Sequence, residues 1–373
     1  MMPSLAPRLM CLAATILMTA IFIGPAHASD NPPGGKPKVV RFAGGGTAGD
    51  GSTALEAQLH SPFGVESDRS GNFFIVELEG GHVHRIDPLG ICTTIAGNGT
   101  KGFAGDGGPA AKGVFNAMHN LAITPAGDIF IADTLNHRIR RIDAADGNIS
   151  TFAGTGRAGS DGDGGPASAA EFNGVYCIAF NADCSRLYVA DLENRRVRGI
   201  DMKTGIVQTV AGNGSKGVPV DGAEAKSAPL VDPRAVAADA AGNVYVLERG
   251  GNALRVVDKA GRIRTIVGTG EPGSTGDGGP GREAKLRGPK HICFDRAGNV
   301  IIADTDNHVI RRYEPKAGTI HRVAGSGRKG AAGLDGPPEN VELDFPHGVF
   351  VHPDGMLYIA DTYNNRILRI VFE

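Results

Sequence analysis

The amino-acid sequence predicts an all-β fold, a six-bladed β-propeller, because a nine-residue motif returns at a nearly fixed interval. The motif is clearest as IADTLNHRI at 131–139 and returns as VADLENRRV, IADTDNHVI and IADTYNNRI at 189–197, 302–310 and 359–367. Two weaker copies are IVELEGGHV at 75–83 and VLERGGNAL at 246–254, and consecutive copies start 56 to 58 residues apart. Such a period marks an array of one supersecondary unit, in which each copy buries its apolar faces against its neighbours.

Within one period, the pattern of apolar residues predicts four strands. In the second copy, LAIT (121–124) is a short apolar strand, and IFIA (129–132) is a continuous apolar run, as expected for a strand covered on both faces. RIRRID (138–143) is a third strand, and NISTFAG (148–154) alternates like a half-buried fourth strand. The 56 glycines of the chain accompany no helical periodicity. Four strands joined by short turns form the antiparallel meander of a propeller blade.

The two ends of the repeat array predict how the ring closes. Each fourth strand ends in Ala-Gly or Val-Gly, starting at positions 43, 96, 153, 211, 267 and 324. The earliest pair, in KVVRFAGGG (38–46), precedes any complete unit, and the last unit stops at LRIVFE (368–373) without a fourth strand. We therefore expect Val39–Ala43 to complete the last blade, because a closed ring leaves no exposed strand edges. The predicted six-bladed propeller covers residues 39–373.

The first 28 residues have the features of a secretory signal peptide. Arg8 precedes a largely apolar run from Leu9 to Ile23, and Ala26-His27-Ala28 has the small-x-small pattern of a cleavage site. The run is too short for a membrane span. SDNPPGGKPK (29–38) is rich in Pro and Gly and is predicted to be a disordered lead-in. We therefore expect an exported protein, periplasmic or extracellular, without membrane insertion.

The composition indicates which kind of partner the protein binds and whether its cysteines form disulfides. The chain has 38 Lys and Arg against 40 Asp and Glu, a net charge of −2, which does not favour a nucleic acid as partner. Four cysteines follow the predicted signal peptide and lack CxxC spacing: Cys92, Cys177, Cys184 and Cys293. Export permits disulfides, but the spacing favours buried free thiols.

The repeat resembles the NHL repeat, a family of six-bladed propellers. The segment 298–310, GNVIIADTDNHVI, matches the NHL pattern closely, and the resemblance covers residues 39–373. Linkers with GDGGPA at 105–110 and 162–167, and GDGGPG at 276–281, resemble the bacterial exported branch. Members of the family sense ligands or bind proteins or RNA, and one related branch has lyase activity. The resemblance therefore implies the fold but not one function.

Strand alternation places the loops between second and third strands on the same face as the long linkers between blades. A carboxylate begins each of these loops: Glu77, Asp133, Asp191, Glu248, Asp304 and Asp361. These side chains suit either a ring for cations or caps that accept backbone N–H bonds of their own loop, helped by a neighbouring Asn. Their presence in every blade favours caps. Blades one and four share a Glu that is soon followed by Gly-Gly, as Glu77-Leu78-Glu79-Gly80-Gly81 and Glu248-Arg249-Gly250-Gly251, which predicts a locally different surface.

The Asp-Gly clusters of the linkers allow two interpretations. Asp161-Gly162-Asp163 has oxygen ligands suited to calcium, but lacks the ligand number and spacing of an EF-hand loop. Tight glycine turns with an Asx hydrogen bond are the favoured interpretation. The Ala-rich continuations at 109–115 and 166–172 are each expected to form a single helical turn.

A ring of varied residues is predicted at the mouth of the central channel, where each first strand begins. Its six members are Phe63, His119, Tyr176, Arg234, Lys290 and His347. Variation within a repeating frame is typical of a ligand-facing surface, and aromatic walls with a few polar groups suit a small ligand. Arg234 and Lys290 in adjacent blades favour a carboxylate or a phosphate. The alternative is a solvated rim without a specific ligand.

Two of these residues also allow a metal hypothesis. Pro346-His347-Gly348 resembles the zinc-binding slot of the propeller lyase that cleaves peptidyl-hydroxyglycine, and His119 occupies the matching position in blade two. Catalytic zinc takes three protein ligands, but the third place holds Arg234, so a ligand such as His60 or His291 would be needed. The segment 177–191 resembles calcium-dependent lactonases of the gluconolactonase type, except that Cys177 replaces their metal-binding Asn.

The sequence thus favours an exported, non-catalytic propeller that binds a small anionic ligand or a protein partner on its linker face. No cofactor is expected on this hypothesis. The alternative is a metal-assisted lyase or hydrolase, dependent on zinc or calcium, with its site at the channel mouth.

Overall fold

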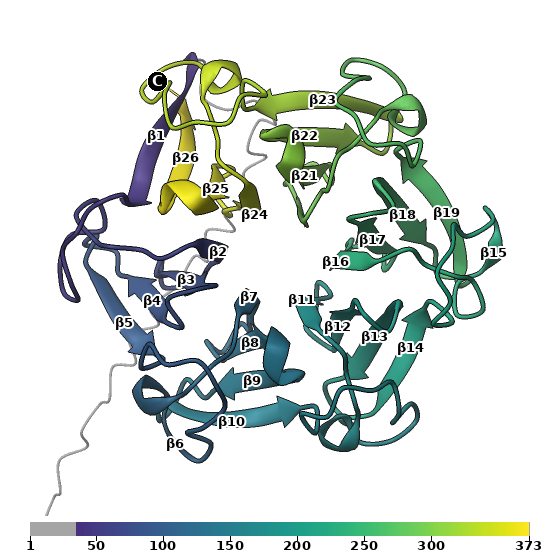
Figure 1. Cartoon of the computed structure of the whole chain (residues 1–373), viewed down its shortest axis with the longest axis horizontal. Helices are drawn as coiled ribbons and strands as arrows, with labels where there is room; N and C mark the ends of the chain where they lie inside the picture. Colours follow the sequence, from purple (N-terminus) through teal and green to yellow (C-terminus); the bar gives the residue numbers. More distant parts are fainter. Residues whose placement is uncertain (1–34, 373) are drawn as a thin grey trace, which may run out of the picture.

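The computed structural model describes residues 35–372, which form six antiparallel sheets of four main strands arranged around a central axis (Figure 1). The predicted signal peptide and residues 29–34 of the predicted lead-in lie outside the described residues. The predicted all-β fold and the six blades are confirmed. In five blades the four main strands follow one another outward from the axis in chain order, and in the sixth the first strand of the chain lies outermost.

The first three blades occupy residues 62–211. Blade one contains β2 (Pro62–Ser67), β3 (Phe73–Glu77), β4 (Val83–Ile86) and β5 (Cys92–Ala96). Blade two contains β7 (Met118–Ile123), β8 (Ile129–Asp133), β9 (Arg138–Ile142) and β10 (Asn148–Ala153), and β10 also pairs with the short β6 (Gly108–Pro109). Blade three contains β11 (Val175–Phe180), β12 (Arg186–Asp191), β13 (Arg196–Asp201) and β14 (Val207–Ala211).

The other three blades complete the ring. Blade four contains β16 (Pro233–Ala238), β17 (Val244–Glu248), β18 (Ala253–Val257) and β19 (Arg262–Val267), with the short β15 (Ala223–Glu224) beside β19. Blade five contains β20 (His291–Phe294), β21 (Val300–Asp304), β22 (Val309–Glu314) and β23 (Thr319–Ala324). Blade six contains β24 (Pro346–Val351), β25 (Leu357–Asp361), β26 (Arg366–Phe372) and β1 (Pro37–Gly44).

The first strand of the chain closes the ring, as predicted. β1 is antiparallel to β26, with Val39 opposite Ile370 and Arg41 opposite Leu368. The strand begins at Pro37, which pairs with Phe372, so it starts two residues before the predicted boundary. Joining the two ends of the chain in one blade removes the open edge that either end would leave.

The apolar core lies between the blades rather than in one centre. Each apolar cluster joins the facing sheets of neighbouring blades: Phe74 and Val83 of blade one, for example, pack with Met118 and Ile131 of blade two. Val39 of β1 is fully buried and packs with Ile301 and Ile310 of blade five. Because each blade covers its neighbour, the ring must be complete before every apolar face is buried.

Single turns of 3₁₀ helix supplement the sheets. Four lie in linkers: η1 (Ala110–Lys112), η3 (Ala167–Ala169), η4 (Gly281–Glu283) and η6 (Pro338–Asn340). Three follow second strands: η2 (Thr134–Asn136), η5 (Thr305–Asn307) and η7 (Thr362–Asn364). The helical turns expected in the Ala-rich linkers are confirmed by η1 and η3.

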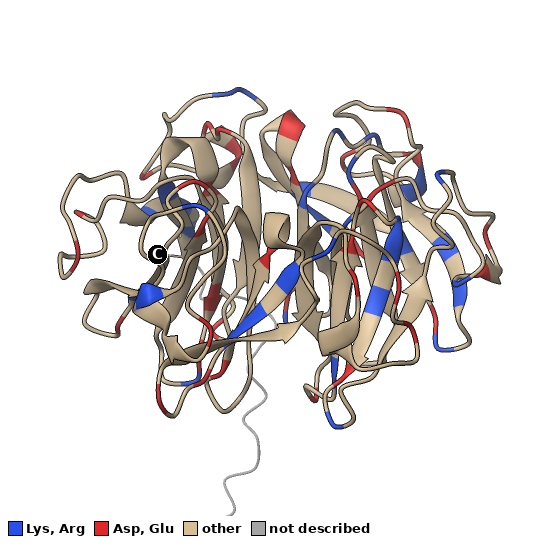
Figure 2. Ribbon diagram, turned by 60° about the horizontal axis from the view of Figure 1, so that its bottom comes forward, with Lys and Arg blue, Asp and Glu red and all other residues tan. Residues whose placement is uncertain are grey.

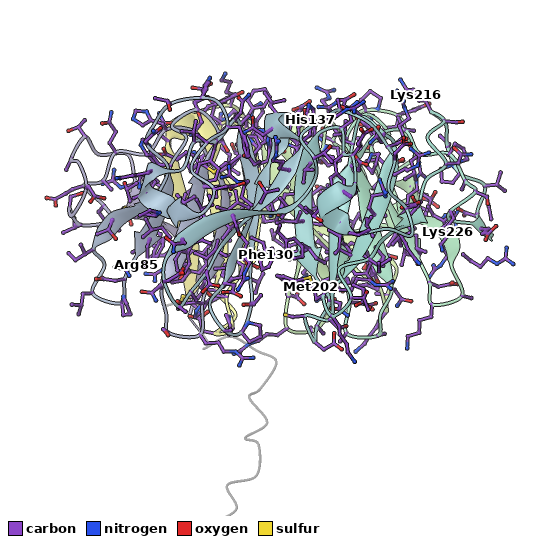
Figure 3. All side chains as sticks on the ribbon, turned by 90° about the horizontal axis from the view of Figure 1, so that it is seen from below. Arg85, Phe130, His137, Met202, Lys216 and Lys226 are labelled. Carbon is purple, nitrogen blue, oxygen red and sulfur yellow. The ribbon has the colours of Figure 1, made fainter. Side chains whose placement is uncertain are left out.

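The two faces of the ring differ as the strand alternation predicts. Figure 3 shows His137, after a second strand, and Lys216, in a linker, at one face, and Met202, in a short turn, toward the other. Basic and acidic residues are interspersed over the surface (Figure 2). Within residues 35–372, no helix is long and apolar enough to cross a membrane.

The four cysteines of the described chain are free, but only two are buried. Cys92 and Cys177 are buried as predicted, whereas Cys184 and Cys293 are partly exposed. The prediction of burial is wrong for Cys184 because this residue lies in the turn between β11 and β12, at a φ of 55°. It is also wrong for Cys293, which lines a cavity in the channel; Cys177 lines the same cavity but is buried.

Closure of the ring by β1 predicts the effect of a charge at Val39. Val39→Asp places a carboxylate in the fully buried contact between blades five and six, and we expect it to lower the free energy of unfolding by about 3 kcal/mol or more. The exposed neighbour Arg41 provides the control, because Arg41→Gln is expected to change stability by less than about 0.5 kcal/mol. Chemical denaturation measures both variants, and equal stabilities would contradict the assigned closure.

Candidate functional site

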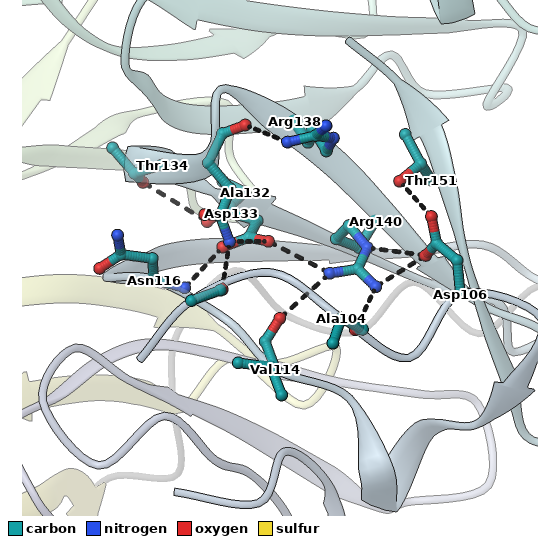
Figure 4. A network of polar contacts seen from close by, with 12 residues as sticks. Ala104, Asp106, Val114, Asn116, Ala132, Asp133, Thr134, Arg138, Arg140 and Thr151 are labelled. Carbon is teal, nitrogen blue, oxygen red and sulfur yellow. Dashed lines mark hydrogen bonds and ion pairs between the residues drawn. The ribbon is translucent and has the colours of Figure 1, made fainter. Parts of the chain in front are cut away.

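The loop after each second strand is held by a buried carboxylate. In blade two, Asp133 accepts the backbone N–H of Asn116 at 2.8 Å and the side-chain amide of Asn136 at 2.8 Å (Figure 4). Equivalent carboxylates of the other blades accept a backbone N–H 17 or 18 residues upstream, at 2.6 to 2.8 Å. The carboxylates accept backbone N–H groups as predicted, but the prediction that each caps its own loop is wrong, because the donor lies in the preceding linker. These carboxylates therefore attach the linker to the blade.

Sequence reasoning missed the partner of these carboxylates, which is a buried arginine. Arg140 has no exposed side-chain surface and lies 3.3 Å from Asp133 and 2.7 Å from Asp106. Its guanidinium also donates to the carbonyl oxygens of Val114 and Ala104, at 3.2 and 3.1 Å. A buried charge persists when it is paired and hydrogen-bonded on every side, and this arginine meets that condition.

Five of the six blades contain a buried arginine of this kind. The arginines are Arg140, Arg198, Arg255, Arg311 and Arg366, and each is at most 6% exposed. Four of them stand seven residues after the carboxylate, a spacing that the sequence already contained. In blade one the position is held by His84.

The linker aspartates also belong to this network. Asp106, Asp163 and Asp277 of the Asp-Gly-Gly segments lie 2.7 to 2.8 Å from the buried arginines of blades two, three and five. The interpretation of the Asp-Gly segments as tight glycine turns did not include the ion pairs between these aspartates and the buried arginines. The arginines supply the positive charge that the calcium hypothesis assigned to a metal ion.

A threonine hydroxyl connects neighbouring blades at the channel mouth. Thr134, after the second strand of blade two, donates to the carbonyl oxygen of Val175 in blade three at 2.7 Å. Thr305 donates to Pro346, and Thr362 donates to Pro62, in the same geometry. Each accepting residue directly precedes a predicted member of the ring at the mouth. The threonine of the Asp-Thr motif therefore positions the side chain that the next blade presents there.

The structure brings the predicted ring together. Phe63 stacks on His347 with ring centroids 3.8 Å apart and contacts His119 edge-on at 4.6 Å. His119 contacts Tyr176 at 4.6 Å, and the guanidinium of Arg234 lies 4.5 Å from the centroid of Tyr176. Five of the six side chains thus form one continuous packed set, whose ligand-binding role stays a prediction.

The sixth member, Lys290, turns toward a carboxylate. Its Nζ lies 3.0 Å from Asp306 and 5.4 Å from the centroid of Phe345. Asp306 follows the second strand of the same blade, so the charge of Lys290 is paired locally. The predicted contribution of Lys290 to binding a carboxylate or a phosphate stays a prediction.

Arg234 has no such partner. Only 4% of the residue is exposed, and its Nε is buried without a hydrogen-bond partner. Its charge lies over the ring of Tyr176 at 4.5 Å and over Phe63, from the opposite blade, at 5.9 Å. Burial lowers the pKa of Arg234 to about 10, so it stays charged at neutral pH. Within residues 35–372 it forms no ion pair with an acidic side chain.

The two histidines of the ring are neutral and fixed in one tautomer. Nδ1 of His119 contacts the carbonyl oxygen of Ala117 at 2.9 Å, and Nδ1 of His347 contacts that of Phe345 at 2.8 Å. A carbonyl oxygen only accepts, so Nδ1 carries the proton and Nε2 keeps its lone pair. Burial lowers the pKa of both imidazoles well below 6.5, and the charge of Arg234 adds to this effect.

The two histidines proposed as additional zinc ligands have other contacts. His60 is exposed, and its backbone N–H donates to Glu77. His291 crosses the channel, where its Nε2 lies 3.2 Å from the amide of Asn120 and its Nδ1 faces the backbone N–H of Val349.

Beside the contact between His291 and Asn120, the channel contains a cavity that the sequence did not predict. It has a volume of about 250 Å³ and is lined by first strands of all six blades, including Glu66, Asn120 and His291. Glu66 accepts the backbone N–H of Ile123 at 3.0 Å, and burial raises the pKa of its carboxyl from 4.5 to about 8. In the sequence, the signal for this cavity is a polar residue, Glu66, within an otherwise apolar first strand.

Fold and site together define a closed propeller of six repeats with a cation at its mouth. The chain resembles NHL-repeat β-propellers, and two family models match parts of it. The NHL repeat matches residues 343–370, and the teneurin NHL domain matches residues 201–275.

Curated relatives and solved structures resemble the chain over more of its length. The chain is 28% identical over 348 residues to NHL repeat-containing protein 2 of Gallus gallus, covering 84% of this chain and 46% of the relative. It is 26% identical over 288 residues to SUPPRESSOR OF QUENCHING 1 of Arabidopsis thaliana, covering 74% of this chain and 27% of that protein. The chain thus spans less than half of either relative. An auxiliary nutrient binding protein from Bacteroides thetaiotaomicron superposes with a TM-score of 0.66 at 15% identity, over 91% of this chain and 77% of that one, which shows the shared fold.

The buried network predicts that Arg140 and its sequence neighbour Arg141 differ in importance. Arg140→Met leaves Asp133 buried without its cation and is expected to lower the free energy of unfolding by about 3–5 kcal/mol. Arg141 is partly exposed and pairs with Asp128 and Asp143 at 2.9 Å, so Arg141→Met is expected to cost less than about 1 kcal/mol. Urea denaturation of both variants tests this order, and similar losses would refute it.

The raised pKa of Glu66 predicts a pH dependence of stability. Between its ordinary pKa of 4.5 and about 8, the folded chain holds a proton that the unfolded chain has lost. Stability is therefore expected to fall as pH rises through this window, by up to about 3 kcal/mol between pH 4.5 and 7. Glu66→Gln cannot lose the proton, so its unfolding free energy is expected to exceed that of the wild type at pH 7 and to match it at pH 4. An unchanged difference between the two proteins across this range would contradict the assignment.

Proposed function

We propose that the chain is an exported binding propeller whose linker face holds a small anionic ligand at the channel mouth, above Arg234. The observation that carries this proposal is the state of this arginine. It is the buried guanidinium at the mouth, and its Nε has no hydrogen-bond partner. The five arginines of the blade network, in contrast, each have a carboxylate within 3.6 Å.

Electrostatics favours an anion at this place. Aromatic contacts with Tyr176 and Phe63 partly offset the loss of hydration, but they do not balance the charge of Arg234. A carboxylate or phosphate would supply both the counter-charge and the missing hydrogen-bond acceptor. The ligand would then supply to Arg234 the counter-charge that an acidic side chain supplies to each arginine of the blade network.

A second basic group adjoins the mouth. Arg249 lies near enough to lower the pKa of His119 and Arg234 through its charge, and it pairs with Asp232 at 3.2 Å. It lines a cavity of about 290 Å³ between blades three and four, together with Arg195 and Lys216. This cavity gives a charged ligand room beside the ring on the linker face.

The binding role agrees with what is known of similar folds. The Bacteroides thetaiotaomicron neighbour is described as an auxiliary nutrient binding protein, and loops held by a rigid scaffold commonly carry binding sites. The features of a signal peptide in residues 1–28 support export to the periplasm or beyond the cell. A protein partner bound to the linker face is the alternative to a small anionic ligand.

A metal-assisted lyase or hydrolase is the second candidate, supported by the fixed tautomers of His119 and His347. Their unprotonated Nε2 atoms are the form that binds zinc, and the hydrogen bond at Nδ1 is typical of metal-bound imidazole. However, Phe63 packs against both rings, and Arg234 occupies the third place. Binding of an anion therefore has the stronger structural support.

Loss of the Arg234 charge tests the proposal. Inorganic phosphate, acetate, oxalate and citrate are titrated into the wild type by calorimetry, and at least one is expected to bind. Arg234→Gln is expected to weaken that binding about tenfold or more, because a charge-assisted hydrogen bond contributes about 1.5–3 kcal/mol. Lys226→Gln removes the same charge from an exposed linker site at the outer rim and is expected to leave affinity unchanged.

The same experiment separates the alternatives. Equal affinities of wild type and Arg234→Gln for every bound anion would refute the anion site. Stoichiometric zinc that disappears in a His119→Ala/His347→Ala double variant would instead favour the metal-assisted enzyme.

A further inference from the structure

Blade one departs from the charge pattern of the other five blades. Glu77 occupies the carboxylate position and is fully buried, as its equivalents are. The arginine that follows seven residues later in four blades is replaced by His84, and His82 lies two residues before it. These positions correspond to Arg140 and Arg138 of blade two. Two imidazoles therefore face a buried carboxylate where a guanidinium stands elsewhere.

The donor atoms of these three side chains converge. Nε2 of His84 lies 3.1 Å from Oε1 of Glu77, and Nδ1 of His82 lies 3.3 Å from Oε2. One donor atom from each residue can be chosen so that all three lie within 4.8 Å of one another. Ligand atoms around tetrahedral zinc are separated by about 3.3 Å, given metal–ligand bonds of about 2.0–2.1 Å. The two measured separations match this spacing.

The environment of His84 provides a second observation that points to a ligand. The residue is 8% exposed, and its Nε2 is buried without a hydrogen-bond partner, despite its closeness to the carboxylate. Buried polar atoms are rarely left unsatisfied, and an atom in this state indicates a missing ion or water. The lone pair of Nε2 and the carboxylate of Glu77 would be satisfied together by one cation.

The surroundings support both ligands, as they do in metal sites. The other ring nitrogen of His84 lies 3.2 Å from the hydroxyl of Thr94, and the backbone N–H of His60 donates to Oε1 of Glu77 at 2.6 Å. Such outer contacts orient ligating side chains and fix the tautomer of a histidine. Glycine at position 80 leaves room for the carboxylate, because a Cβ there would lie 1.8 Å from Oε2.

The site is closed on one side and open on the other. His84 and Glu77 are buried, whereas the side chain of His82 is 29% exposed. A metal ion would therefore have three protein ligands and a fourth position that water can reach. Two imidazoles and one carboxylate suit zinc and neighbouring transition metals better than calcium or magnesium, which prefer oxygen ligands.

We propose that Glu77, His82 and His84 form a zinc-binding site that replaces, in blade one, the buried arginine of the other blades. A guanidinium is permanently charged, whereas an imidazole ligates a metal in its neutral form. The divalent ion then balances Glu77, which accepts the N–H of His60, and so holds the linker against the blade. The site is distinct from the channel mouth and does not depend on the anion-binding proposal.

Metal titration of the full chain tests the site. Zinc chloride is titrated by calorimetry into protein treated with a chelator, and the melting temperature is measured with and without zinc. We expect one zinc ion per chain and a higher melting temperature with zinc. Cobalt in place of zinc is expected to give visible absorption bands of a low-symmetry site.

A designed substitution separates loss of metal from loss of fold. His84→Arg copies blade four, where Arg255 pairs with Glu248, so this variant is expected to fold with at least the stability of the metal-free wild type. Its zinc affinity is expected to fall more than about 100-fold, since loss of an outer contact alone costs about 10–100-fold. His352→Ala removes another histidine that lies beside a carboxylate, Asp354 at 2.9 Å, and is expected to bind zinc normally.

Two results would overturn the proposal. One is a folded wild type that binds no stoichiometric zinc, and the other is zinc binding that survives in His84→Arg. Zinc lost in the His119→Ala/His347→Ala variant but kept in His84→Arg would assign the metal to the channel mouth instead.

Discussion

The structure depends on a buried ion pair that is repeated around the ring. An arginine of the third strand is enclosed between the carboxylate at the end of the second strand and carbonyl oxygens of the preceding linker, as Arg140 is between Asp133 and Val114 (Figure 4). Long linkers contain few apolar residues, so packing alone would hold them weakly. The guanidinium attaches them at several points at once. The linker face thereby becomes a rigid surface, although it is built from loops.

This rigidity allows the residues at the mouth to vary without loss of the fold. Threonine hydroxyls hold the backbone of the next blade, as Thr134 holds Val175, while the side chain one residue later is not needed for the frame. The mouth can therefore present aromatic, cationic and imidazole groups in one layer. Arg234 is buried in this layer without a carboxylate, and the proposed anion site rests on this difference from Arg140 and its equivalents.

The repeat made much of the fold predictable. A constant period predicted six blades, and the unmatched strands at the two ends predicted closure by Val39–Ala43, which the pairing of β1 with β26 confirms. The carboxylates were correctly predicted to accept backbone N–H groups, but the linker, rather than their own loop, supplies the donor. The distinction escaped prediction because the donor of Asp133, Asn116, is 17 residues away in the chain. Likewise, the contact of Lys290 with Asp306 escaped prediction because it depends on rotamers that no sequence pattern reports.

The sequence by itself determined the class of fold, the number of blades and the positions that meet at the channel mouth, because each follows from a period that is local along the chain. Only the tertiary structure decided which charges are satisfied. The contact of Arg234 with Phe63 joins opposite blades, that of Asn120 with His291 crosses the channel, and both depend on the width of the closed ring. Periodicity assigns equivalent positions to the blades, but the reach of a side chain across the axis is a property of the assembled ring.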